Sequence, residues 1–241
     1  MSDSERDRLP SSVFQIDPRM REGRYTDQYF LNVKSILTNL ASEGYGFEGQ
    51  ALRLPEEAPD AAGTDVGNLL TEMQCFTRRQ PFSVACGVDH ALAILRECTG
   101  YHDAEGAFHN TASGLEVEAV HDGQRLDPAV PCLKIRGRYR DYGYLETPIL
   151  GVLARQTAVA TNTYRLHQAS GGKPVLFFPA RYDLPASQSA DGYAYKVGVE
   201  CYNRDTGSDV TPLITSEAQG GWRGGQGGGT VSHSYLLTCF W

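Results

Sequence analysis

The first part of the chain carries apolar residues at helical spacing. After Thr26, which can cap a helix, apolar positions recur every three or four residues up to Gly44, as expected for a helix with one buried face. These positions are Tyr29, Phe30, Val33, Ile36, Leu37 and Leu40. Residues 1–24 are polar, rich in Arg, Asp and Pro, and lack this period. We therefore expect a flexible arm followed by one amphipathic helix.

In the middle of the chain the apolar period shortens to two. Apolar and polar residues alternate over 115–120, and the Asp122-Gly123 pair that follows is a strong turn signal. Residues 129–138 give a further strand with an apolar centre. Upstream, the pattern predicts a loop over 45–68, one or two strands within 69–84 and a short helix over 85–98, stopped by Gly100. This region is therefore expected to be rich in β-structure.

The second half alternates helical and strand patterns. A long helical pattern over 145–169, broken at Gly151, is followed by the all-apolar run 175–178. The length and flanks of that run suit a strand buried on both faces. Residues 186–199 are again helical in pattern, although Gly192 weakens it, and a second short strand is expected near Val197. This order argues for βα units and an α/β barrel-like second half.

Three polar residues follow the expected strands of this second half. Arg181 comes directly after the 175–178 strand, and Glu200 and His233 each follow a further expected strand. Active sites of barrel folds lie at the carboxyl ends of their strands, so these residues are candidate site residues. The alternative for each is an ordinary surface or loop position.

Composition and charge are those of a globular protein that does not bind nucleic acid. Of 241 residues, 41% are hydrophobic and 21% are charged, which leaves enough apolar material for a core. The net charge of −7 disfavours contact with a phosphate backbone. Four basic residues cluster nearby in sequence, and we interpret them as a solvated strand face, with a small phosphate pocket as the alternative. They are Lys134, Arg136, Arg138 and Arg140.

Targeting and cysteine patterns point to the cytoplasm. The start has no secretion signal, and no apolar run approaches the ~20 residues of a membrane helix. The six cysteines contain no Cys-x-x-Cys pair, so reduced, mostly buried thiols are expected and a metal site is not. Glycines crowd residues 220–229, and we expect a flexible loop there, with a phosphate cradle as the less favoured alternative.

Six segments, in order, resemble those of the nicotinate phosphoribosyltransferase family and its nicotinamide-using relatives. They are YTDQYF at 25–30, CGVDHAL at 86–92, LET at 145–147 with VATN at 159–162, AR at 180–181, AY at 194–195 with Gly198 and Glu200, and GTVSHS at 229–234. Each match is weak alone, but the six together are specific. They span residue 25 to the end of the chain.

The resemblance implies a fold and a reaction. The fold is α/β: an α+β N-terminal domain over 25–140, then an incomplete irregular α/β barrel of the type II phosphoribosyltransferase kind over 141–241. Residues 1–24 would be a flexible arm. The reaction joins nicotinate to 5-phosphoribosyl 1-diphosphate, with Mg²⁺, releasing diphosphate in NAD biosynthesis or salvage. A homodimer, or pairing with a second chain, is implied, and no nucleic acid or membrane partner.

The resemblance also implies roles for individual residues. Tyr29 matches the family tyrosine that stacks on the pyridine ring, often across a dimer, and Arg181 would bind the pyridine carboxylate or a phosphate. Thr230 and Glu146 would contribute to substrate binding, Glu146 by orienting the barrel entrance. Outside the resemblance, Tyr29 is equally well an apolar-face helix residue.

Two further residues would be catalytic. His233 matches the histidine that ATP phosphorylates in some members, which makes ATP a second candidate cofactor. Glu200 stands where the family usually has Asp, so it departs from the pattern. Outside the resemblance, His233 is more often a loop residue.

The family continues with further βα units after the segment that ends near His233. A barrel without them leaves sheet edges and apolar faces open. We therefore expect a second polypeptide, a tight oligomer, or a truncated and inactive remnant. A catalytically inactive pyridine-binding or regulatory protein is one alternative function. A phosphoribosyltransferase for another aromatic acid is a second, and the Glu200 departure is its only hint.

Overall fold

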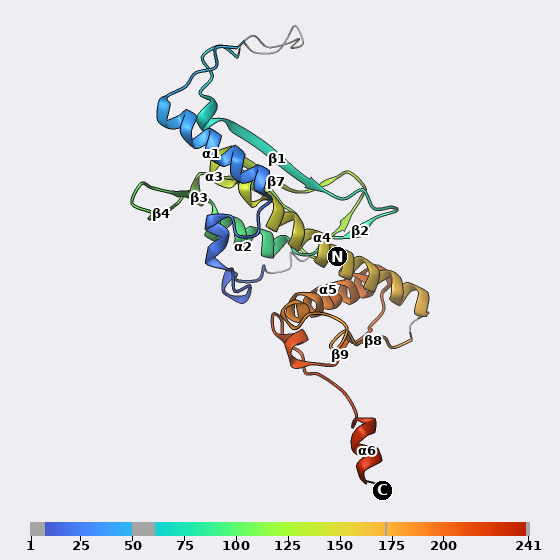
Figure 1. The fold of residues 1–241 in the computed structure, drawn as a ribbon. Coiled ribbons are helices and arrows are strands. Elements are labelled where there is room, and N and C mark those ends of the chain that lie inside the picture. Colours follow the sequence, from blue (N-terminus) through green and yellow to red (C-terminus); the bar gives the residue numbers. More distant parts are fainter. Residues whose placement is uncertain (1–7, 50–60, 172, 240–241) are drawn as a thin grey trace.

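The computed structural model describes residues 8–49, 61–171 and 173–239. Figure 1 shows one long central helix, α4, with a mixed α/β part packed around its first half and a smaller part around its second half. The helices are α1 Gln28–Glu43, α2 Val88–Cys98, α3 Tyr139–Tyr142, α4 Glu146–Ser170, α5 Gln188–Thr206 and α6 His233–Cys239. At 25 residues, α4 is about 37 Å long, so it joins both parts of the molecule.

The main sheet of the first part is antiparallel. Its order is β1 (Leu70–Phe76), β7 (Pro131–Arg138) and β5 (Glu116–Ala119), with β7 in the centre. Leu133 and Ile135 on β7 are fully buried, so one face of the sheet packs into the core while the other carries charges. Burial alternates along β7, whereas β5, which covers the alternating segment of the sequence, is mostly exposed.

Two-stranded sheets complete the strand inventory. Antiparallel pairs join β2 (Ser83–Val84) to β6 (Arg125–Leu126) and β3 (Gly100–His102) to β4 (Phe108–Asn110). In the second part, β8 (Leu176–Phe177) pairs in parallel with β9 (Leu213–Ile214). The expectation of parallel strands there is confirmed, and the described residues form no closed barrel.

The second part differs from the sequence prediction in three places. The strand expected near Val197 is wrong, since helix α5 continues through this residue to Thr206. Val197 is fully buried because α5 packs against α4. Leu176 of β8 is 52% exposed, so this strand is not buried on both faces. Helix α4 runs unbroken through Gly151, since a single glycine lowers helix stability without ending the helix.

Residues 8–24 pack closely on the body, although a flexible arm was expected. They form two short 3₁₀ turns, Ser11–Val13 and Pro18–Glu22. The Phe14 ring stacks on His90 of α2 with ring centroids 4.8 Å apart, and Arg8 forms a 2.7 Å ion pair with Asp89. Apolar contact and an ion pair to a nearly buried carboxylate hold this segment in place.

The remaining predictions on the fold have mixed outcomes. Lys134 and Arg136 do lie on a charged strand face, where they pair with Glu118, Glu72 and Glu116, whereas Arg140 lies in α3. Five cysteines are buried free thiols and Cys239 is an exposed one. Much of the loop predicted over 45–68 falls outside the described residues. Within the described ranges, no helix has the length and apolar character needed to cross a membrane.

Candidate functional site

Tyr29 and Glu146 lie where α1 and α4 begin. Tyr29 is in the first turn of α1, and Glu146 is the first residue of α4. The two helix starts are fastened together, because the Thr26 hydroxyl donates a 2.7 Å hydrogen bond to the carbonyl oxygen of Tyr144. The starts of α1 and α4, far apart in sequence, therefore lie together; we call this junction the α1–α4 corner.

The surroundings of this corner raise the pKa of both groups. The Tyr29 ring is 58% exposed, with one side against Phe30 at a ring-centroid distance of 4.2 Å. Desolvation, and then the charges of Asp27 and Glu146, raise the pKa of the Tyr29 phenol. Burial raises the pKa of Glu146. The corner thus offers a neutral aromatic face beside a carboxylate.

A pocket of about 500 Å³ lies along the first half of α4, beginning one turn after its start. Its walls are the end of β1, the start of β7 and one face of α4, with Leu126, Leu150, Leu153 and Ala154 as apolar lining. The thiols of Cys75 and Cys132 also line it, and burial raises the pKa of Cys75 to about 12. This size falls within the roughly 300–1,000 Å³ of small-molecule sites.

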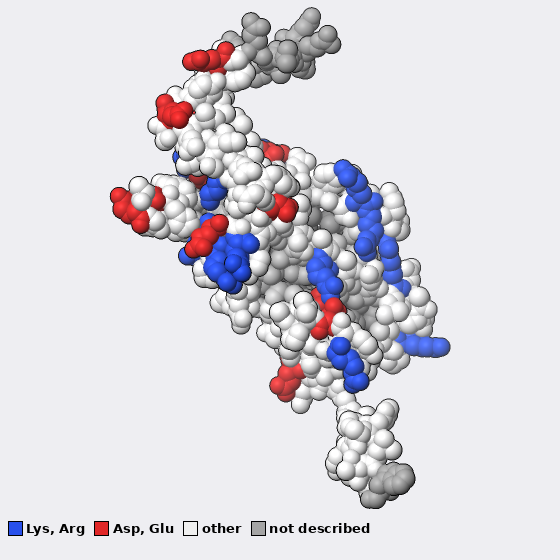
Figure 2. All heavy atoms as spheres, in the orientation of Figure 1, with Lys and Arg blue, Asp and Glu red and all other residues white. Residues whose placement is uncertain are grey.

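Two arginines on the rim of this pocket were missed in the sequence. Arg78 lies over the Phe76 ring at 5.4 Å, and Arg79 donates a 3.2 Å hydrogen bond to the amide oxygen of Asn162. Neither forms an ion pair with a described carboxylate. Figure 2 shows basic side chains gathered along the edge where β1 ends and α4 passes. Their signal in the sequence was an Arg-Arg pair inside the segment 69–84, which was predicted to hold one or two strands.

Arg181 lies in a turn that follows β8. The carbonyl oxygen of Pro179 accepts hydrogen bonds from the backbone N–H groups of Tyr182 at 2.7 Å and Asp183 at 3.0 Å. The Arg181 side chain is exposed, and its guanidinium lies 5.5 Å from the centroid of the Phe178 ring. Arg181 therefore follows a strand of the parallel pair, as expected.

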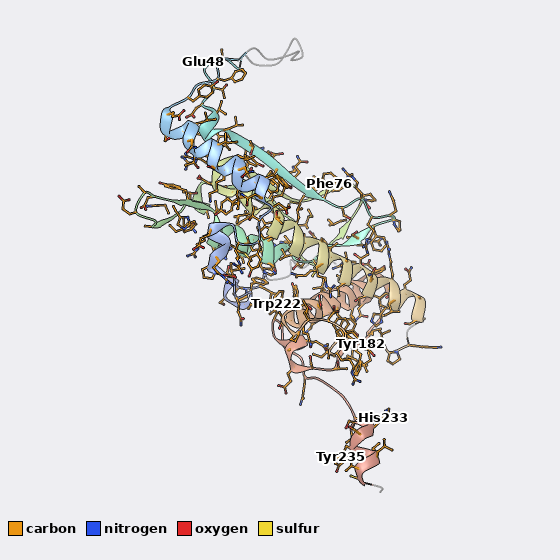
Figure 3. The ribbon with its side chains drawn as sticks, viewed as in Figure 1. Glu48, Phe76, Tyr182, Trp222, His233 and Tyr235 are labelled. Atoms are coloured by element: carbon orange, nitrogen blue, oxygen red, sulfur yellow. The ribbon has the colours of Figure 1, made fainter. Side chains whose placement is uncertain are left out.

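Glu200 and His233 do not follow strands, so that part of the prediction is wrong. Glu200 lies within α5, in its last two turns, and is partly buried. His233 begins α6, after an extended segment that contains Thr230, and both residues are exposed. Figure 3 shows His233 and Tyr235 on this short helix, which projects from the part of the molecule that carries Tyr182 and Trp222. The predicted site residues thus lie in separate regions of one chain.

Across the described ranges, no group of three or more His, Cys, Asp and Glu side chains is arranged to hold a metal ion.

Comparison with known sequences places the pocket in a recognised domain. Residues 61–157 match the family described as quinolinate phosphoribosyl transferase, N-terminal domain. A nicotinate phosphoribosyltransferase of Caenorhabditis elegans is 31% identical over 156 residues, covering 63% of this chain and 25% of the relative. The nicotinate phosphoribosyltransferase of Bos taurus is 29% identical over 191 residues, covering 69% and 33%. The chain thus spans a quarter to a third of these relatives.

Solved structures show the same fold. A nicotinate-nucleotide pyrophosphorylase from Pyrococcus furiosus has a TM-score of 0.64 at 23% identity, covering 94% of this chain and 47% of that one. Human nicotinic acid phosphoribosyltransferase has a TM-score of 0.59 at 21% identity, covering 89% and 40%. The α/β class and the likeness to type II phosphoribosyltransferases are confirmed. Over the part of these relatives that the chain spans, its sequence and fold are thus similar to those of nicotinate phosphoribosyltransferases.

Proposed function

We propose that this protein serves a nicotinate phosphoribosyltransferase reaction, joining nicotinate to 5-phosphoribosyl 1-diphosphate with release of diphosphate. The observation that carries the proposal is a 500 Å³ pocket rimmed by Arg78 and Arg79. The charge of Glu146 acts both on Cys75 in the pocket wall and on Tyr29. All of the pocket's lining residues except Ala158 fall within the segment that matches the family's N-terminal domain. We propose a cytoplasmic protein, in keeping with these substrates.

The pyridine ring would be held by an aromatic face and a cation. The exposed Tyr29 ring offers a surface on which a flat heterocycle can stack. Arg181 is exposed and can donate two parallel hydrogen bonds to the nicotinate carboxylate or to a phosphate. Glu146 would orient the entrance, as the family resemblance implies.

The phosphoribosyl donor would be held by positively charged groups. Loss of diphosphate from the sugar leaves positive charge on the ring and negative charge on the leaving group, so guanidinium groups near that group lower the barrier. Arg78 and Arg79 supply such groups in an otherwise acidic chain. Mg²⁺ bound with the donor would add charge to the diphosphate oxygens. Thr230 would bind substrate, and His233 and Glu200 would act in catalysis, with ATP as a phosphate source for His233.

A complete site is proposed to need two polypeptides. Tyr29 belongs to the α1–α4 corner, whereas Arg181 belongs to the turn after β8. A second copy of this chain, or a second chain that supplies more of the barrel, would bring such residues together. A homodimer is the simpler arrangement, because a two-fold axis builds two equivalent sites from one surface.

Ligand-dependent melting tests this function. A ligand that binds only the folded state raises its stability by ~2.7 kcal/mol at a hundredfold excess over the dissociation constant. We expect nicotinate, and separately 5-phosphoribosyl 1-diphosphate with Mg²⁺, to raise the melting temperature of the wild type. In Arg181→Ala the nicotinate shift should be lost, while the exposed Lys173→Ala control keeps it. No shift of the wild type with either ligand would contradict the proposal.

A binding protein without turnover is the second candidate. It is favoured by the exposed position of Thr230 and His233 on a segment that projects from the body. A nicotinate-induced shift without one from the phosphoribosyl donor, together with no product in a mononucleotide assay, would support this candidate over the enzyme.

A further inference from the structure

Arg155, in the middle of α4, holds a buried carboxylate of α5. Its Nε and Nη2 atoms donate hydrogen bonds of 3.0 and 2.9 Å to the two carboxylate oxygens of Asp191. Asp191 is 1% exposed, so this pair is shielded from solvent on the carboxylate side. Two parallel bonds fix the plane of the guanidinium as well as its position.

The same guanidinium reaches a second carboxylate, on the turn after β8. Its Nη2 atom lies 3.0 Å from Oδ2 of Asp183, whose side chain is 39% exposed. Hydrogen bonding and charge from Asp191, then from Asp183, raise the pKa of Arg155, so the cation is permanent. One arginine therefore joins α4, α5 and the turn that contains Arg181.

The backbone on both sides of Arg181 is anchored. On one side, the Gln188 side-chain amide donates a 3.2 Å hydrogen bond to the carbonyl oxygen of Ala180. On the other side stands Asp183, two residues on, held by Arg155. Between these anchors the Arg181 side chain itself is exposed and points to no described carboxylate. Tyr182, the next residue, which Figure 3 labels, is 79% exposed.

We propose that Arg155 is a positioning residue, which acts through Asp183 to hold the turn that presents Arg181 to an anionic substrate group. The role given to Arg181 rests on the proposed function, whereas the clamp on the turn does not. An exposed arginine on a free turn would lose orientational entropy on binding a carboxylate. Fixing its backbone in advance removes part of that cost, and a displacement of about 1 Å at such a group is enough to weaken recognition.

The Asp183 contact has little value as a stabilising ion pair. The buried carboxylate of Asp191 is already satisfied by two bonds from Arg155, and a half-exposed pair adds little to folding because water screens it. Its consequence is therefore local order in the turn. Removing the Asp183 contact should therefore loosen the turn and leave the fold intact. A positioning role can in this way be told apart from a structural one.

Asp183→Asn is the decisive variant, because it keeps the side-chain size and leaves the buried Arg155–Asp191 pair untouched. Glu217→Gln, which removes an exposed carboxylate from the same part of the molecule, is the matched control, and Asp183→Glu is the conservative rescue. Three quantities are measured on the full chain: the melting temperature, amide hydrogen exchange at Tyr182, and the dissociation constant for nicotinate.

The expected result is an unchanged melting temperature, faster exchange at Tyr182, and roughly 5- to 10-fold weaker nicotinate binding in Asp183→Asn. The control should behave as the wild type, and Asp183→Glu should recover most of the affinity. Unchanged exchange at Tyr182 overturns the clamp. Faster exchange with unchanged affinity overturns the positioning of Arg181. If Arg181→Ala also binds nicotinate normally, the proposed role of Arg181 fails on its own, while the exchange result still decides the clamp.

Discussion

At the scale of single residues, His167 is a buried polar side chain on α4 that faces two tyrosines of α5. It is fully buried between the rings of Tyr195 and Tyr202, and neither ring nitrogen has a hydrogen-bond partner among the described residues. Burial lowers the pKa of His167. An unsatisfied buried polar group costs stability, and a protonated one would cost more.

Replacing His167 by Phe should therefore stabilise the protein, by about 1 kcal/mol at neutral pH. The folded-state pKa lies below the unfolded value of about 6.5, so the stability linked to this group is present above that pH and is lost as the pH falls. The gain in His167→Phe should accordingly grow on acidification. Urea unfolding of both proteins at pH 7.5 and 5.5 measures it. A loss of stability at both pH values would mean that the imidazole has a polar partner.

The sequence pointed to some candidate site residues and not to others. Tyr29, Glu146 and Arg181 were found because short motifs carry them, and their roles stay predictions. Arg78, Arg79 and Arg155 were missed, because an arginine on a strand end or helix surface looks like an ordinary solvated residue. What distinguishes Arg155 is a pair of carboxylates 28 and 36 positions away, and only the fold brings these together.

At the scale of elements, the packing of α4 on α5 depends on glycine. A Cβ atom at Gly198 would collide with the carbonyl oxygen of Ala160 and with the side chain of Thr163. Gly192 is equally tight against the backbone at Gln219. These glycines weaken the helical pattern in the sequence, yet they allow the helix to approach its neighbours closely. The low helix propensity of glycine thus makes helix α5 look less favourable in the sequence than it is in the structure.

Gly198→Ala should destabilise the protein by roughly 1 to 3 kcal/mol, because the added methyl group forces α4 and α5 apart. The matched control is Gly151→Ala, in the interior of α4, where a Cβ would meet nothing within 4 Å. There the higher helix propensity of alanine should stabilise by about 0.5 to 1 kcal/mol. Thermal or urea unfolding measures both variants. Similar effects of the two substitutions would show that helix propensity, and not close packing, governs this region.

Long amphipathic elements were the most predictable ones. The helices near 26–43 and 145–169 and the alternating strands of the main sheet follow from periodicity alone, and the structure confirms them. The prediction that residues 175–178 form a strand buried on both faces was wrong. Four consecutive apolar residues suggest such a strand, yet Leu176 is exposed. Periodicity cannot report which neighbours cover a short strand. The strand predicted near Val197 is also wrong, because this apolar residue is buried by helix packing and not within a sheet.

At the scale of the whole molecule, the predicted site residues divide into separate groups. Tyr29 and Glu146 share the α1–α4 corner, Arg181 belongs to the clamped turn, and Thr230 and His233 lie on a projecting segment (Figure 3). If the proposed site forms between two copies, Tyr29 of one copy would serve Arg181 of the other. Such sharing can be tested without a structure of the complex, because defects on different copies can complement each other.

Tyr29→Ala and Arg181→Ala should each abolish formation of nicotinate mononucleotide when assayed alone. After the two variants are unfolded together and refolded in equal amounts, half of the dimers are mixed. One of the two sites in each mixed dimer then has both residues intact, so about a quarter of the wild-type activity should return. A double variant carrying both changes, refolded with wild type in the same ratio, controls for refolding losses. If the mixture of single variants stays inactive while this control is active, Tyr29 and Arg181 must act within one chain, and the site has to be rebuilt around α4 of a single copy.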